Sequence, residues 1–148
     1  LLGKNCRYNG GHSRISELDE LDVDFIPVCP EEAGNLGTPR PAAEMQGSSE
    51  NILKGHARIL TNDGNDVTKQ FVQGAKKSLE VGLTSGVEVA ILKSHSPSCG
   101  VGEVYDGSFT HSLTDGNGIF SHLCRESGIT CISSDESDQI KQTLKKLK

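Results

Sequence analysis

The chain has 148 residues, a formal net charge of -5 and a hydrophobic share of 34%. This length suits one domain with its own core, and we expect residues 1–148 to form a single domain. Because the net charge is negative, we expect no broad basic surface that could bind the phosphates of a nucleic acid. No apolar run approaches the length of a membrane span. We therefore expect neither nucleic acid nor a membrane as a partner.

The first part of the chain predicts a short helix, a strand and a long loop. Apolar residues recur at near-helical spacing within residues 13–22, which predicts an amphipathic helix. The apolar, β-prone run at 23–29 predicts a strand, and Pro30 stops it, so Cys29 should lie at the carboxyl end of that strand. Glycine and proline punctuate residues 31–55, where we expect an irregular functional loop.

Strands and helices alternate through the rest of the chain. We expect strands at 56–62, 87–93 and 129–135, and helices at 66–86, 119–128 and in the lysine-rich C-terminal segment. Residues 101–118 are rich in Asp-Gly and Asn-Gly turn signals and should be irregular. This order predicts an α/β protein with a three-layer Rossmann-like fold, in which a largely parallel sheet is covered on both faces.

The five cysteines are odd in number and irregular in spacing, which argues against a disulfide framework and predicts a reducing, cytoplasmic location. Cys29 and Cys99 stand beside proline and glycine at the ends of predicted strands, where α/β proteins bind ligands, so both are candidate functional thiols. Cys124 and Cys131 fall in apolar patterns and are expected in the core. Cys6 lies in a polar loop, and its position leaves its role open, nearer to a bystander.

Charged residues near these thiols add a second set of candidates. Glu31 follows Cys29 by two residues and is a candidate proton carrier, because a carboxyl group in a partly dry site can be tuned toward neutral pH. A solvated loop carboxylate like Glu32 is the alternative, and the residues alone slightly favour it. Arg40 and Lys93 are candidates to offset thiolate charge. The sequence contains neither a CxxC nor an HExxH motif, the patterns that would indicate a zinc site.

Several motifs in this order carry a resemblance: LLG, CRYNGG, PVCPE, NLGTPR, PAAEM, GNDVTKQFVQGA, ILKSHSPSCG and VYDGSF. Together they resemble a bacterial family, long catalogued as a domain of unknown function, that is now associated with thiouracil desulfidases. The resemblance implies a four-iron four-sulfur cluster held by three cysteines, which leaves one iron free to take the sulfur of a thiolated base. Water would then replace sulfur without net redox change. The implied substrate is a thiolated small molecule such as 2-thiouracil.

The resemblance also implies which residues do the work. Its second and third cluster ligands correspond to Cys29 and Cys99. Its first ligand is the cysteine directly before LLG, and this sequence begins at Leu1, so we expect that ligand upstream, with Cys6 as a possible substitute and a cluster that is absent or held poorly here. The catalytic residues that it implies are Glu31 as the acid–base carboxylate and either Ser96 or Ser98.

Two alternatives to this function stay open. The first is a cluster-free hydrolase or transferase in which Cys99 is the nucleophile and His95 or His12 is the base. The second is a non-enzymatic iron–sulfur or thiol-based sensing module. The sequence leaves the physiological substrate and the oligomeric state open.

Overall fold

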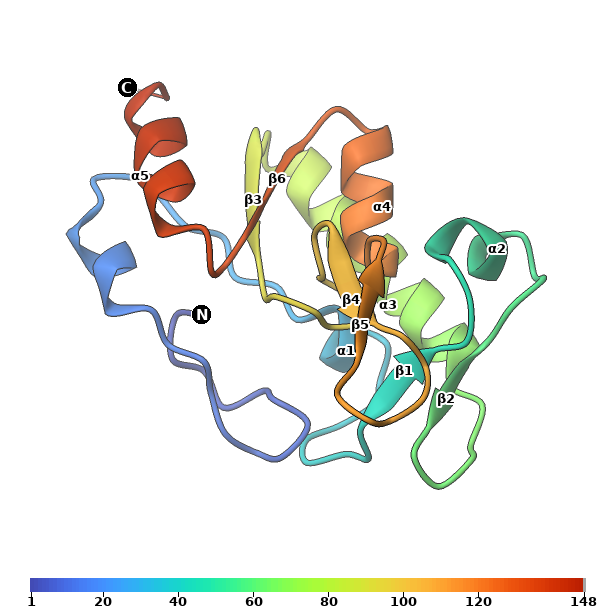
Figure 1. Cartoon of the computed structure of the whole chain (residues 1–148). Coiled ribbons are helices and arrows are strands. Elements are labelled where there is room, and N and C mark those ends of the chain that lie inside the picture. The colour runs from blue at the N-terminus through green and yellow to red at the C-terminus, as the bar shows by residue number, and fades with distance from the viewer. Residues whose placement is uncertain (148) are drawn as a thin grey trace.

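A computed structural model describes residues 1–147 of the chain, and short helices and strands alternate along it (Figure 1). In chain order the elements are η1 (Ser16–Glu20), α1 (Pro30–Ala33), β1 (Ala43–Met45), α2 (Ser49–Leu53), β2 (Ile59–Thr61), α3 (Thr68–Thr84), β3 (Val89–Leu92), β4 (Glu103–Tyr105), β5 (Leu113–Asp115), α4 (Ile119–Glu126), β6 (Thr130–Ser133) and α5 (Ser137–Lys145). The mixture confirms the predicted α/β class.

The longest helix, α3, begins and ends where its sequence predicts. The carboxylate of Asp66 accepts the backbone N–H of Thr68 at 3.0 Å, which satisfies one of the free donors of the first turn. Phe71 and Ala75 are buried on one face of the helix. Gly86 ends it with φ of +70°, a left-handed conformation that glycine adopts without a steric penalty.

One parallel strand pair forms the centre of the molecule. β3 and β6 pair in parallel, with Val89 opposite Thr130 and Leu92 opposite Ser133. α5 covers one face of the pair and α3 and α4 cover the other (Figure 1). Two apolar clusters match this layering: Ile132 packs with α5 in one, and Leu92 belongs to the other. The predicted order of helix, sheet and helix is therefore present around these two strands.

The remaining strands pair antiparallel, so the predicted parallel arrangement is limited to β3 and β6. β1 pairs with β2, and β4 pairs with β5, so within residues 1–147 the strands form three two-stranded sheets and only one of them is parallel. The segments 31–55 and 101–118, predicted to be irregular, contain short regular elements. Most of α1, together with β1 and α2, lies in the former, and the β4–β5 hairpin lies in the latter.

Two early predictions differ from the structure. Within residues 13–22, only Ser16–Glu20 are helical, as the 3-10 helix η1 in place of the predicted amphipathic helix. The predicted strand at 23–29 is wrong, because these residues form no strand and pair with none of the strands within residues 1–147. Ile26 and Val28 are exposed as a result. Cys29 thus does not end a sheet strand, and it lies directly before α1.

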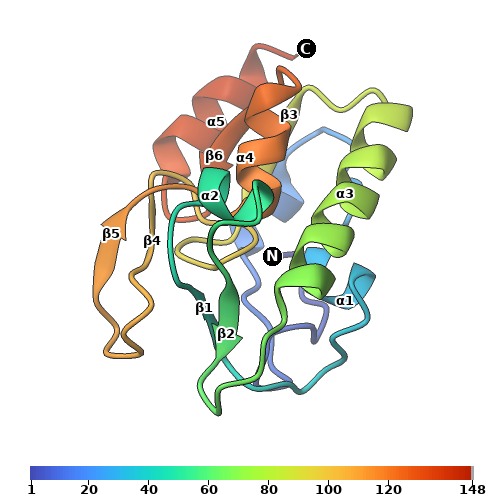
Figure 2. The same ribbon diagram turned by 90° about the vertical axis from the view of Figure 1, so that its right-hand side faces the viewer.

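α1 is held against α3 at backbone contact distance (Figure 2). A Cβ atom on Gly74 of α3 would lie 1.8 Å from the carbonyl oxygen of Pro30, and one on Gly34 would lie 2.0 Å from that of Gln70. Only glycine permits this approach. The contact fixes α1, and with it the residues around Cys29. Within residues 1–147, none of the helices has both the length and the apolar character needed to cross a bilayer.

Candidate functional site

Cys29 is positioned by the start of α1. Its carbonyl oxygen accepts the N–H of Ala33 at 2.9 Å, and Pro30 occupies the first turn, where its missing N–H costs nothing. Burial, together with the neighbouring Cys6 thiol and Glu31 carboxylate, raises the pKa of the Cys29 thiol to about 11. The thiol therefore lies in a half-buried setting among other acidic groups.

Cys6 lies beside Cys29. One ligand atom from each of Cys6, Cys29 and Glu32 lies within 4.8 Å of the others, so two thiols and a carboxylate form a compact donor group. The carbonyl oxygen of Cys6 accepts Nη2 of Arg40 at 2.9 Å, which holds the N-terminal loop against the site. Spacing along the chain does not indicate that Cys6 and Glu32 meet, because their segments are brought together only by the tertiary fold.

Glu32 is held in place by two polar neighbours. Its carboxylate accepts the hydroxyl of Thr38 at 2.9 Å and lies 3.3 Å from the ammonium of Lys4. The Thr38 hydrogen bond, with Lys4 beside it, holds the pKa of Glu32 below its usual value. The structure thus brings Glu32 to the thiols, whereas the sequence suggested only a solvated loop carboxylate.

Cys99 follows β3 on the loop SHSPSCG. Its backbone N–H donates to the hydroxyl of Ser96 at 2.8 Å, and Ser98 is fully buried. Burial raises the pKa of the Cys99 thiol well above its usual range, and negative charge at Glu31 and then at Cys29 raises it further. Cys99 is therefore close enough to Glu31 and Cys29 to interact with both electrostatically.

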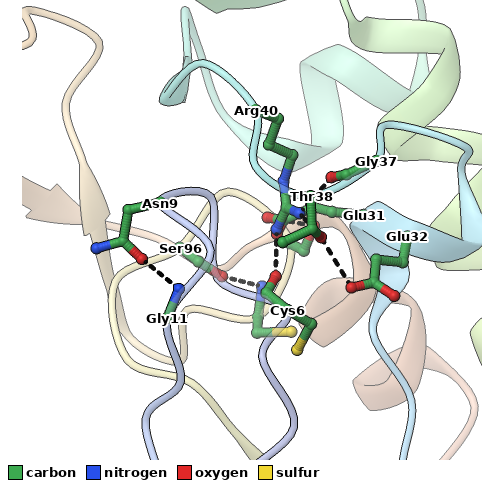
Figure 3. A network of polar contacts seen from close by, with 11 residues as sticks. Cys6, Asn9, Gly11, Glu31, Glu32, Gly37, Thr38, Arg40 and Ser96 are labelled. Carbon is green, nitrogen blue, oxygen red and sulfur yellow. Dashed lines mark hydrogen bonds and ion pairs between the residues drawn. The ribbon is translucent and has the colours of Figure 1, made fainter.

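Glu31 and Arg40 form a partly buried ion pair beside these thiols (Figure 3). The side chain of Arg40 is 6% exposed and that of Glu31 is 17% exposed. Arg40 also donates to the carbonyl oxygen of Gly37 at 2.7 Å, and the hydroxyl of Ser98 donates to Oε1 of Glu31 at 3.2 Å. The carboxylate of Glu31 is thus fixed from two sides, by a cation at one oxygen and a hydroxyl at the other.

A cavity of about 260 Å³ opens beside this ion pair. Glu31, Arg40 and Ser96 line it, and the rings of Tyr105 and His111 contribute to its wall. Its volume is below the range of about 300–1,000 Å³ typical of pockets for drug-sized ligands, so it suits a single small ring. The charged wall and the aromatic wall together match a small polar heterocycle.

The remaining cysteines and histidines lie outside this group. Cys124 is buried on α4, as predicted, and its pKa is raised by a hydrogen bond with Cys131 and then by burial. Cys131 is half-buried and packs against the main apolar cluster. His12 accepts the N–H of Arg14 through Nδ1 at 3.2 Å, and no hydrogen bond joins it to a cysteine among residues 1–147.

The donor set fits an iron–sulfur cluster. Cys6 and Cys29 supply two sulfurs, the ligand that iron–sulfur clusters use in proteins, and Cys99 lies outside their donor group but interacts electrostatically with Cys29. The raised pKa values of Cys29 and Cys99 describe thiols that would be deprotonated by a bound cation rather than by the protein alone. Glu31 and Arg40 line the neighbouring cavity without themselves belonging to the sulfur group.

Comparisons with known proteins agree with this reading. The model of the 2-thiouracil desulfurase family matches residues 1–136. The uncharacterized protein YbbK of Bacillus subtilis (strain 168) is 37% identical over 143 residues, 95% of each chain. A solved structure titled as the [4Fe-4S]-dependent thiouracil desulfidase TudS is 38% identical, has a TM-score of 0.86, and is matched over 98% of this chain and 93% of its own. From the extent of these matches, the chain belongs to the 2-thiouracil desulfurase family.

Proposed function

We propose that this chain is an iron–sulfur-dependent desulfidase that exchanges the sulfur of a thiolated small molecule, such as 2-thiouracil, for the oxygen of water. The observation that carries the proposal is the sulfur group of Cys6 and Cys29, with Cys99 in electrostatic reach, next to a small cavity that Glu31 lines. Membership of the family and likeness to a [4Fe-4S]-dependent thiouracil desulfidase support it.

Cys29 and Cys99 are the proposed cluster ligands in this chain. For the third ligand the described residues offer Cys6, whose sulfur lies with that of Cys29. When bound, the cluster supplies a soft iron with an open position that polarises the thiocarbonyl as a Lewis acid. Such an open position is what distinguishes catalytic from structural metal sites.

Glu31 is the proposed proton carrier. Its Oε1 accepts a proton from the attacking water, whose oxygen forms the new bond to the carbon that bears sulfur. That proton and the second proton of the water then pass to the departing sulfur, so that a thiocarbonyl and water give a carbonyl and hydrogen sulfide, with no electrons gained or lost. Arg40 holds the carboxylate of Glu31 in place, and the hydroxyl of Ser98 orients its Oε1.

Ser96 and Ser98 have different proposed roles. The hydroxyl of Ser96 lines the cavity and accepts the N–H of Cys99, so it can contact the substrate while ordering the cysteine loop. Ser98 is buried and bonds to Glu31, so it positions the carboxylate rather than contacting substrate. Ser96 is therefore the serine that we assign to the substrate side.

The cluster-free alternative has less support from the geometry. A cysteine nucleophile needs a neighbouring base and a lowered pKa, whereas burial raises that of Cys99. His95 packs edge-on against Tyr105 and lies 3.8 Å from Glu103, and no hydrogen bond joins it to Cys99 in the described part of the chain.

The test is turnover by anaerobically prepared protein. A brown protein should convert 2-thiouracil into uracil and release one equivalent of sulfide without any added reductant. A brown protein without turnover would favour a sensing module instead. A colourless protein that turns over, and is inactivated by alkylation of Cys99 alone, would overturn the cluster mechanism in favour of a cysteine nucleophile.

A further inference from the structure

Glu44 is a buried carboxylate with an unusual set of partners. It lies in the middle of β1 and is 8% exposed. Its Oε1 accepts the backbone N–H of Gly107 at 2.9 Å and that of Phe109 at 3.2 Å. Within residues 1–147 no ion pair involves Glu44. A buried carboxylate without a cation depends on such donors, so Glu44 and the loop between β4 and β5 are held together.

The same loop is pressed against β1 at a second point. Nε2 of Gln46 donates to the carbonyl oxygen of Gly107 at 3.1 Å. Gly107 has φ of +94°, and a Cβ atom there would lie 2.7 Å from the carbonyl oxygen of Met45. Figure 1 shows this loop, in orange, passing beside β1. Residues 44–46 and the loop at 106–112 therefore form one joint, which we call the β1–hairpin clamp.

The clamped loop carries His111 to the cavity, and it directly follows Tyr105, the last residue of β4. Tyr105 and His111 both line it, with ring centroids 6.3 Å apart and an edge-to-face angle of 78°. Tyr105 also meets the ring of His95, with centroids 5.8 Å apart. Phe109 and His111 have φ of 58° and 60°, conformations that L-residues rarely adopt without outside support. The clamp supplies that support.

We propose that Glu44 is a positioning residue for the desulfidase reaction, which it serves by holding the β4–β5 loop so that Tyr105 and His111 form an aromatic wall for the planar ring of the substrate. The inference rests on the proposed function. Aromatic rings prefer defined stacked or edge-on arrangements, so a wall that is free to move would bind a planar heterocycle less well. Glu44 and Glu31 line the same cavity, but no hydrogen bond joins Glu44 to Glu31 or to a cysteine among residues 1–147, so the chemistry itself should be little affected.

Variants of Glu44 test the carboxylate side of the clamp. Glu44→Ala should raise KM and Kd for 2-thiouracil about tenfold and leave kcat within about twofold, because it alters substrate placement rather than the reacting groups. Iron content should stay at the wild-type level. Glu44→Gln keeps an acceptor oxygen and should recover much of the affinity. Asp115→Asn, an exposed carboxylate change on β5, is the control and should change nothing.

A matched glycine pair tests the other side of the clamp. Gly107→Ala and Gly102→Ala both place a side chain at positive φ in this hairpin, but only the former meets β1, because nothing lies within 4 Å of a Cβ atom at Gly102. Gly107→Ala should reproduce the rise in KM and Gly102→Ala should not. If Glu44→Ala does not fold, the comparison of these two glycine variants tests the clamp in its place.

Amide hydrogen exchange and the Kd of 2-thiouracil separate the inference from the proposed function. The N–H groups of Gly107 and Phe109 should exchange faster in Glu44→Ala, and binding should weaken, whether or not the protein turns over. If wild-type protein lacks turnover but these effects occur, the clamp stands and the desulfidase proposal fails. Unchanged exchange and unchanged Kd in Glu44→Ala and Gly107→Ala would overturn the clamp. A parallel loss of kcat, iron and thermal stability would also overturn it, by showing a general structural role.

Discussion

Replacing Glu31 by glutamine removes one negative charge from the site and leaves its shape almost unchanged. Loss of a general base typically costs about 10²–10⁴-fold in rate, so we expect kcat to fall by that factor. Breaking a buried ion pair costs about 3–5 kcal/mol, but Arg40 keeps acceptors at Gly37, Thr38 and Cys6, so we expect about 1–2 kcal/mol here. That corresponds to a drop in Tm of roughly 3–8 °C for a chain of this size.

The assay is sulfide release from 2-thiouracil, measured beside iron content and thermal unfolding. Iron should stay at the wild-type level, because Glu31 is not a member of the sulfur group. Glu50→Gln is the matched control, since Glu50 is an exposed residue of α2 that pairs with Lys54. A Glu31→Gln variant that keeps more than a tenth of wild-type kcat would refute the role assigned to Glu31, as would an equal loss in the control.

Two further predictions concern how the site is built. Gly74→Ala should destabilise the protein by about 3 kcal/mol or more and lower iron retention, because a Cβ atom there meets the carbonyl oxygen of Pro30. Gly82→Ala on the same helix should be neutral or stabilising by about 0.5–1 kcal/mol. Equal unfolding curves for the two variants would contradict this prediction. In metal-free protein, the raised pKa of Cys29 contributes stability that is fully present below about pH 9.0 and is lost as pH rises towards 11. The free energy of unfolding, measured by chemical denaturation, should therefore fall across that window in wild type and fall less steeply in Cys29→Ala, where the raised pKa of Cys99 still contributes.

The parts of the fold that the sequence predicts well are those with a local signal. The helical spacing of α3, the apolar runs of β3 and β6 and the stop signal at Gly86 act over a few residues, and the structure has these elements close to their expected bounds. Residues 23–29 have the same β-prone composition as a strand, but strand formation needs a partner, and no local pattern reports whether one is available.

The candidate site likewise contains some residues that a local sequence pattern marks and others that only the tertiary fold brings together. Cys29 and Cys99 stand out because proline and glycine flank them, and the same loops carry Glu31 and Ser96. Cys6 gives no such signal, and it joins the group only because Arg40 binds its carbonyl oxygen from 34 residues away. Contacts of this kind depend on the whole fold and are invisible to spacing.

The hydrogen bonds of Glu44 in the β1–hairpin clamp also could not be predicted from the sequence. Its partner loop lies more than 60 residues away, and the hydrogen bonds run to backbone groups that any residue possesses. Glu44 lies in the motif PAAEM and Gly107 in the motif VYDGSF, and a glycine is needed where the loop meets β1. Motif resemblance marked both segments without giving the physical reason.

The most direct test of the account is the iron and acid-labile sulfide content of single cysteine variants after anaerobic reconstitution. Cys29→Ala and Cys99→Ala should lose nearly all bound iron and sulfide, and Cys6→Ala should lose most of it, because the sulfur of Cys6 lies with that of Cys29. Cys124→Ala and Cys131→Ala should keep wild-type content, because both belong to the apolar core. Iron that survives in the Cys29 and Cys99 variants and disappears from the Cys124 and Cys131 variants would contradict the assignment of the site.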